Sequence, residues 1–105
     1  MSNETAEMEI VADFCVIVSD DSMTQSRILK GDRVYISEAA SVNDGDIVAV
    51  VIDNSLHLKR IYRDIEHSGL ILKSDNPKYS PLVLSESEAA INILGKAVAF
   101  SSSTI

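Results

Sequence analysis

Residues 47–62 decide the fold of this chain, and they read IVAVVIDNSLHLKRIY. The first six of these residues are nearly all β-branched, which favours a strand at the centre of a sheet. Residues 53–55, Asp-Asn-Ser, have the composition of a tight turn, and residues 56–62 return to a strand-like run. The segment therefore predicts a β-hairpin whose first strand is buried.

Five further runs have the length and the apolar, β-branched content of strands. They are residues 10–18, 33–37, 69–73, 82–84 and 91–100. Gly95 predicts a bulge in the last of them. The chain has no internal repeat and no alternation of strands with long helices, so seven or eight short strands and one short helix indicate an all-β domain with a barrel-like core.

A polar stretch interrupts the strand pattern between the first two runs. Asp20, Asp21 and Ser22 are favourable N-cap residues and predict a short helix over residues 23–29. Gly31 is expected to end this helix, because glycine tolerates the left-handed backbone conformation.

Composition and charge describe one small globular domain. The chain has 105 residues, of which 46% are hydrophobic and 24% charged, which suffices for a single core. Its net charge of −7 repels phosphate and disfavours nucleic-acid binding by this domain alone. The single cysteine, Cys15, excludes an internal disulfide and fits a reducing cytoplasm, and we expect it to be buried and inert.

The sequence contains no signal for membrane insertion or export. No apolar run approaches the roughly 18 residues that span a bilayer, and the acidic N-terminus differs from a signal peptide. We therefore expect a soluble, cytoplasmic domain that makes no membrane contact. Residues 1–10 are interpreted as a flexible leader or truncated linker, residues 11–100 as the folded domain, and residues 101–105 as a frayed C-terminus.

Ser22 lies where a strand gives way to the predicted helix, a position suited to a nucleophile. Backbone N–H groups at the start of a helix lack internal partners and can stabilise a developing oxyanion. A serine nucleophile also needs a base, for which His57, His67 and Lys59 are the candidates. Neither histidine is accompanied by an orienting acid in a recognisable pattern.

Lys59 can act as a base only while its amine is neutral. Lowering its pKa from about 10.4 to a useful value of about 7–8 requires a fall of about 3, equivalent to about 4 kcal/mol. Burial among apolar groups acts in that direction. The neighbours Leu56, Leu58 and Ile61 supply such surroundings.

Simpler interpretations of the same residues remain open at this point. Ser22 is explained by helix capping alone, and a strand lysine such as Lys59 is usually solvated. Asp20, Asp21 and Asp32 lack the spacing of a calcium loop and are explained by capping and turn chemistry. We therefore expect no metal and no cofactor.

Several ordered motifs, taken together, resemble the self-cleaving domain of LexA-type and phage repressors, the S24 family of serine peptidases. The motifs are Asp21-Ser22-Met23 with Ile28, Gly31-Asp32 and Val34-Tyr35-Ile36, then Leu58-Lys59-Arg60-Ile61, then residues 72–79 and residues 93–98. The resemblance extends from about Val11 to Phe100, so it covers nearly the whole chain.

The resemblance implies a coiled all-β fold in which neutral, buried Lys59 takes the proton of Ser22, which attacks a peptide carbonyl. It also implies an oxyanion hole formed by the backbone N–H groups of Asp21 and Ser22. The implied substrate is a peptide bond in the upstream linker of the same chain, cut in the SOS response with a RecA filament as co-protease. In such repressors a separate N-terminal helix-turn-helix domain binds DNA, and the self-cleaving domain forms a homodimer.

Three features depart from the family's pattern. Asp20 stands where many members have Gly, and Gln25 stands where Pro is common. Residues 1–21 contain no Ala-Gly or Cys-Gly pair, so the sequence does not identify a scissile bond. Two alternatives follow: a non-catalytic dimerisation and regulatory module that keeps the fold, or a signal-peptidase relative, which the missing membrane anchor disfavours.

Overall fold

The computed structural model describes residues 12–66, 68–84 and 91–102. Its elements, in chain order, are β1 (Phe14–Ile17), the 3₁₀ helix η2 (Thr24–Ser26), β2 (Arg33–Ser37), β3 (Ile47–Ile52), β4 (Ser55–Asp64), β5 (Gly69–Lys73), β6 (Leu82–Leu84) and β7 (Ile91–Ser101). The predicted leader and the start of the first predicted strand lie outside the described residues. β7 runs one residue further than predicted, since Ser101 pairs with Arg33.

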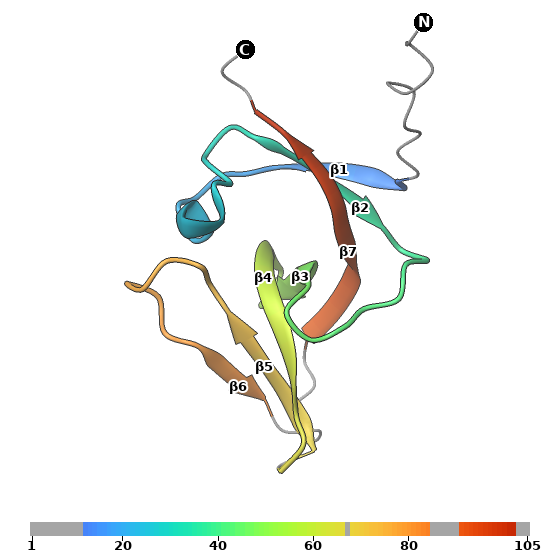
Figure 1. The fold of residues 1–105 in the computed structure, drawn as a ribbon, viewed down its shortest axis with the longest axis vertical. Helices are drawn as coiled ribbons and strands as arrows, with labels where there is room; N and C mark the ends of the chain where they lie inside the picture. The colour runs from blue at the N-terminus through green and yellow to red at the C-terminus, as the bar shows by residue number, and fades with distance from the viewer. Residues whose placement is uncertain (1–11, 67, 85–90, 103–105) are drawn as a thin grey trace, which may run out of the picture.

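The strands form one sheet in the order β1-β2-β7-β3-β4-β5-β6, and every neighbouring pair is antiparallel. Figure 1 shows this sheet curled around on itself, with the long, bent β7 strand between β2 and β3. The predicted all-β, barrel-like class is therefore confirmed. The curl brings η2 and the loop between β5 and β6 to the same side of the molecule (Figure 1).

The predicted hairpin is the centre of the sheet. β3 pairs with β4 on one side and with β7 on the other. Asp53 and Asn54, at the tip of the hairpin, have φ values of 50° and 66°. Positive φ at both central residues is typical of the tight turns that match the twist of two antiparallel strands.

Apolar side chains pack on both faces of this hairpin, because successive residues of a strand point to opposite faces. On one face, Ala49 and Leu58 join a cluster with Val16, Val18, Met23, Ile28, Val34 and Ile36. On the other face, Val48, Val50 and Ile61 pack with Leu72. Lys59 pairs with Val48 and shares this second face.

The predicted helix over residues 23–29 is wrong in its length and in its cap. Only Thr24–Ser26 is helical, Met23 occupies the N-cap position, and no side chain caps the helix. Arg27 takes a left-handed conformation with φ 63°, which ends the helix and returns Ile28 to the core at 2% exposure. Gly31 has φ 94°, so its predicted left-handed conformation is confirmed.

The expected burial of Cys15 is also wrong, because its side chain is exposed. β1 lies at the edge of the sheet, and its residues alternate between the core and the solvent. Val16 faces the core, whereas Cys15 and Ile17 face outward. An apolar run at a sheet edge is therefore buried on one face only.

Gly95 allows β2 and β7 to approach closely. The pairing of β7 with β3 slips by one residue beside Gly95, which confirms the predicted bulge. A Cβ atom at this position would lie 2.6 Å from the carbonyl oxygen of Ser37 and 2.7 Å from Cγ2 of Ile36. Both atoms belong to the packed interior, so neither can move away freely.

Replacing Gly95 by alanine should lower the free energy of unfolding by about 1–3 kcal/mol, the usual cost of overpacking a core. Urea denaturation followed by circular dichroism measures this change. Asn92→Ala, at an exposed position of the same strand, is the control, and it should change stability by less than about 0.5 kcal/mol. A Gly95→Ala protein as stable as the wild type would contradict the close approach of β2 and β7.

Candidate active site

Ser22 is held in a closed loop between β1 and β2, called here the serine loop (residues 18–32). Two backbone hydrogen bonds close its neck, from the N–H of Val18 to the oxygen of Asp32 at 2.9 Å and from the N–H of Gly31 to the oxygen of Val18 at 2.8 Å. Met23 is almost fully buried in the core cluster beside it. Ser22 itself is 4% exposed, so its position is fixed by the core rather than by a helix.

The hydroxyl of Ser22 is not a helix cap in this structure. It donates a hydrogen bond to Oδ1 of Asp20 at 2.8 Å. The backbone N–H of Ser22 donates to the same oxygen at 3.0 Å. Thus one carboxylate oxygen binds both the predicted nucleophile and one of the two predicted oxyanion donors.

Lys59 extends from β4, and its side chain is partly buried. Its Nζ donates a hydrogen bond to Oγ of Ser74 at 2.7 Å and lies 5.7 Å from the centre of the Tyr79 ring. Burial lowers the pKa of the Lys59 amine below its ordinary value, while the negative charge of Asp20 acts in the opposite direction. A lowered lysine pKa is what a neutral amine base requires.

The loop between β5 and β6 packs directly against the serine loop, and we call it the docking loop (residues 74–81). Figure 1 shows it lying next to η2. The backbone N–H of Gln25 donates to the oxygen of Asp75 at 2.9 Å, and the hydroxyl of Ser26 donates to the Asp75 carboxylate. The amide of Asn76 donates to the backbone oxygen of Asp21 at 2.7 Å.

The carboxylate of Asp21 provides a second contact between these two loops. It accepts a hydrogen bond from the hydroxyl of Tyr79 and forms an ion pair with Lys78 at 2.7 Å. These contacts hold the pKa of Asp21 below its ordinary value, with the Lys78 bond as the largest cause. In return, Asp21 raises the pKa values of Lys78 and of Tyr79.

Arg60 fixes the docking loop from the β4 side. Its Nε atom binds the carboxylate of Asp75 at 2.7 Å, and its Nη2 atom donates to the hydroxyl of Ser26 at 3.0 Å. Its Nη1 atom donates to the backbone oxygen of Gly45 at 2.5 Å. One guanidinium therefore joins η2, the docking loop and the turn before β3.

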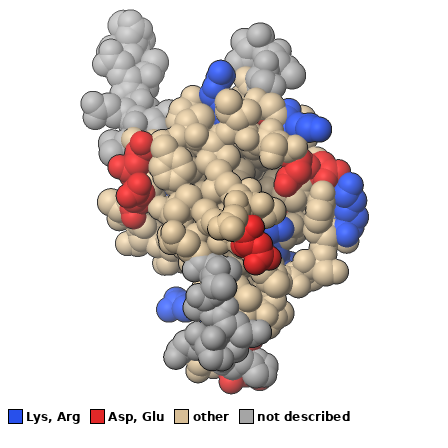
Figure 2. Space-filling view, turned by 180° about the vertical axis from the view of Figure 1, so that it is seen from behind, with Lys and Arg blue, Asp and Glu red and all other residues tan. Residues whose placement is uncertain are grey.

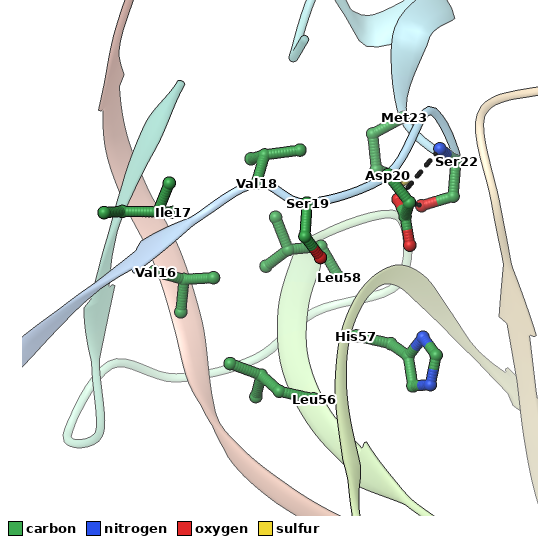
Figure 3. A pocket seen from close by; sticks show the side chains of 10 residues that line it. All are labelled: Val16, Ile17, Val18, Ser19, Asp20, Ser22, Met23, Leu56, His57 and Leu58. Atoms are coloured by element: carbon green, nitrogen blue, oxygen red, sulfur yellow. Dashed lines mark hydrogen bonds between the residues drawn. The ribbon is translucent and has the colours of Figure 1, made fainter. Parts of the chain in front are cut away.

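A small pocket opens beside Ser22. It has a volume of about 90 Å3 and is lined by residues of β1, the serine loop and the start of β4, namely Val16–Ser19, Asp20, Ser22, Met23 and Leu56–Leu58. Figure 3 shows the Asp20 carboxylate between Ser22 and the ring of His57. The pocket is lined by both apolar and polar side chains, and Ser19, Asp20, Ser22 and His57 supply its polar groups.

On the face drawn in Figure 2, Lys and Arg side chains are scattered among Asp and Glu and form no broad basic patch. Within residues 12–66, 68–84 and 91–102, no group of three or more His, Cys, Asp or Glu can hold a metal ion. No helix in the same ranges is long and apolar enough to cross a membrane.

The Asp20 carboxylate acts on both predicted residues. Asp20 binds Ser22 directly and lies close enough to Lys59 to influence its charge. No hydrogen bond joins Ser22 and Lys59 in the described part of the chain: the Ser22 hydroxyl donates to Asp20, and Nζ of Lys59 donates to Ser74. Of the histidines considered as bases, His57 lines the pocket, whereas His67 lies outside the described residues.

Three residues of this site had no catalytic part in the sequence-based interpretation. Asp20 was assigned to capping, although an Asp two residues before a Ser is also the pattern of an Asx-turn, in which the carboxylate binds that N–H group. Arg60 and Ser74 belong to motifs that the sequence analysis identified, but no contact was predicted for either residue. Their partners are distant in sequence, so no local pattern would have identified them.

The whole set of residues lies within one family match. A family model described as Peptidase S24-like matches residues 4–98. The chain belongs to this S24-like peptidase family. It is 32% identical to a LexA repressor of Citrifermentans bemidjiense over 85 residues, and 35% identical to a LexA repressor of Clostridium botulinum (strain Hall) over 82 residues. These matches cover 81% and 78% of this chain but only 41% and 40% of the relatives, so the chain spans about two fifths of the length of these relatives.

Replacing Asp21 by asparagine should destabilise the protein more at pH 7 than at pH 3. Because the folded-state pKa of Asp21 is lowered, its ionised form stabilises the fold above the unfolded-state pKa of about 3.9, and this contribution is lost as the pH falls through the folded-state pKa. Urea denaturation of both proteins at the two pH values measures the difference. Glu66→Gln, at an exposed position, is the matched control; a pH-independent effect of Asp21→Asn would contradict the ion-pair account.

Proposed function

We propose that Ser22 and Lys59 form the Ser-Lys dyad of a self-cleaving peptidase domain in a LexA-like repressor. The observation that carries this proposal is a buried serine that binds Asp20 and a lysine of lowered pKa that feels the charge of the same residue, in a chain of the S24-like peptidase family. A buried hydroxyl and a desolvated amine are the two groups that this chemistry needs.

In the proposed mechanism, the neutral Lys59 amine accepts the proton of Ser22 while Oγ attacks a peptide carbonyl carbon. The backbone N–H groups of Asp21 and Ser22 stabilise the resulting oxyanion. The protonated Lys59 then donates its proton to the leaving amine, which leaves an acyl-enzyme on Ser22 that water hydrolyses. Ser74 supports this role, because its hydroxyl accepts a hydrogen bond from Nζ and holds the amine at the site.

The proposed substrate is a peptide bond upstream in the same chain, within the linker of a phage-type or SOS-type repressor. The similarity to LexA repressors supports this assignment. We further propose that this domain is the C-terminal part of such a repressor, that it acts in the cytoplasm, and that a RecA filament promotes its cleavage. DNA binding would then belong to an N-terminal domain of the repressor.

One observation favours a second function, that of a non-catalytic dimerisation and regulatory module. The Ser22 hydroxyl donates to Asp20 rather than to Lys59, so the arrangement described here lacks the hydrogen bond that the first catalytic step uses. In that case the S24-like fold would serve assembly alone, and Ser22 would be a structural residue of the loop.

Self-cleavage of the full-length repressor, followed on gels from pH 7 to pH 10, separates these two functions. The rate should rise with pH as the neutral fraction of Lys59 rises, and Ser22→Ala and Lys59→Ala should each reduce it by at least about 100-fold while the fold is kept. Lys73→Ala, which removes an exposed lysine of β5, is the control and should cleave normally. Cleavage by either dyad variant at the wild-type rate would refute the dyad, and no cleavage by any protein, even with RecA filaments, would favour the non-catalytic module.

We also propose that the domain forms a homodimer through an apolar surface of β7. Val98 and Phe100 are 41% and 54% exposed and line one groove. Phe100→Asp should convert a dimer into a monomer in sedimentation velocity experiments, because a charge at an apolar interface must be desolvated. Ile65→Asp is the control, because Ile65 is 88% exposed and lies between β4 and β5, away from β7. This variant should leave the dimer intact. A wild-type protein that is monomeric at high concentration would overturn the proposal.

A further inference from the structure

We infer that Asp20 holds Ser22 in a resting state and thereby restrains the proposed self-cleavage. Its carboxylate is the only side chain that hydrogen-bonds Ser22 within the described part of the chain, and it contacts Ser22 through two different groups. Because this role presupposes the self-cleavage proposed above, it deepens that function by assigning a third residue to the site.

The first part of the restraint is geometric. A hydroxyl group has a single proton, and that of Ser22 is directed to Oδ1 of Asp20 at 2.8 Å. Transfer of this proton to Lys59 therefore requires the hydroxyl to rotate away from a charged acceptor, and hydrogen bonds to charged acceptors are about twice as strong as neutral ones. Asp20 thus stabilises the state that precedes catalysis.

The second part concerns the oxyanion donor. The N–H group of Ser22 donates to the same oxygen at 3.0 Å, so a negatively charged oxygen already lies where that N–H points. A substrate carbonyl oxygen that is to use this donor must displace the carboxylate. The side chain therefore competes with the oxyanion for one of the two predicted donors.

The third part is electrostatic and acts on Lys59. The charge of Asp20 favours the protonated amine, in opposition to burial, which favours the neutral amine. The other groups around Lys59 are Ser74 and Tyr79 of the docking loop and His57, which lies on the same face of β4. Removal of the Asp20 charge therefore lowers the pKa of Lys59 and raises its neutral fraction at neutral pH.

A simpler explanation is that Asp20 only shapes the loop. A carboxylate that accepts the N–H two residues later forms an Asx-turn, a common loop structure. Asparagine forms the same turn with its side-chain oxygen, so Asp20→Asn keeps the turn and removes the charge. Asp20→Ala removes both the charge and the acceptor for the Ser22 hydroxyl. The two variants together separate the turn from the restraint.

The test is self-cleavage of the full-length repressor against pH for wild type, Asp20→Asn and Asp20→Ala, with thermal melting as a check of the fold. We expect Asp20→Asn to cleave several-fold faster than the wild type at pH 7, because removal of the Asp20 charge lowers the pKa of Lys59 and raises its neutral fraction. The rising limb of its pH profile should move to lower pH. Asp20→Ala should cleave at least as fast, since it also frees the hydroxyl. Glu66→Gln changes the net charge equally and should match the wild type.

The possible outcomes distinguish this inference from the proposed function. Faster cleavage by the Asp20 variants, lost again when Lys59→Ala is added, supports both. A wild type whose cleavage depends on Lys59, with an Asp20→Asn variant of equal or slower rate and an unshifted pH profile, overturns the restraint alone. If Asp20→Ala does not fold, Asp20→Asn still decides the question. Absence of cleavage in every variant at every pH overturns the proposed function, and the restraint falls with it.

Discussion

The guanidinium group of Arg60 makes the contact on which the candidate site depends. It binds the carboxylate of Asp75, the hydroxyl of Ser26 and the backbone oxygen of Gly45. These groups belong to three segments that are far apart in sequence. A planar group with five donors in a fixed geometry can satisfy several acceptors at once, and a lysine cannot replace it in this role. Without this contact, the docking loop and the serine loop would lose their shared anchor on β4.

Two neighbouring residues of β4, Lys59 and Arg60, have different roles at the site. Lys59 binds Ser74, and Arg60 binds Asp75, so two successive residues of the strand hold two successive residues of the docking loop. The arginine contributes structure, because it joins three segments. The lysine is partly desolvated, which lowers its pKa and opposes folding. Such a locally unfavourable group is expected at functional sites, where other contacts must compensate for it.

Strands were predicted more reliably than the loop that carries Ser22. Short β-branched runs bounded by turn residues identified β2, β3, β5 and β6 to the residue, because their apolar faces and turn chemistry are local properties. The prediction of a helix over residues 23–29 was wrong because its outcome depended on long-range packing rather than on local properties. Its capping residues were present, but Ile28 had to enter the core, and Arg27 turned the chain to place it there. Cys15 shows the same limit, since burial depends on whether a strand lies at the edge or the centre of a sheet.

The sequence by itself determined the fold class, the hairpin at the centre of the sheet and the two residues proposed for the dyad. The fold class and the hairpin follow from periodicity and turn composition, which are properties of short segments, whereas the dyad follows from the resemblance of the ordered motifs to a known family. Only the tertiary structure decided which groups surround that dyad. Lys59 donates to Ser74, and Asn76 and Tyr79 donate to Asp21, because the curled sheet brings the docking loop against the serine loop (Figure 1). These long-range hydrogen bonds, the burial of Lys59 and its pKa shift depend on neighbours in space, and no spacing along the chain encodes them.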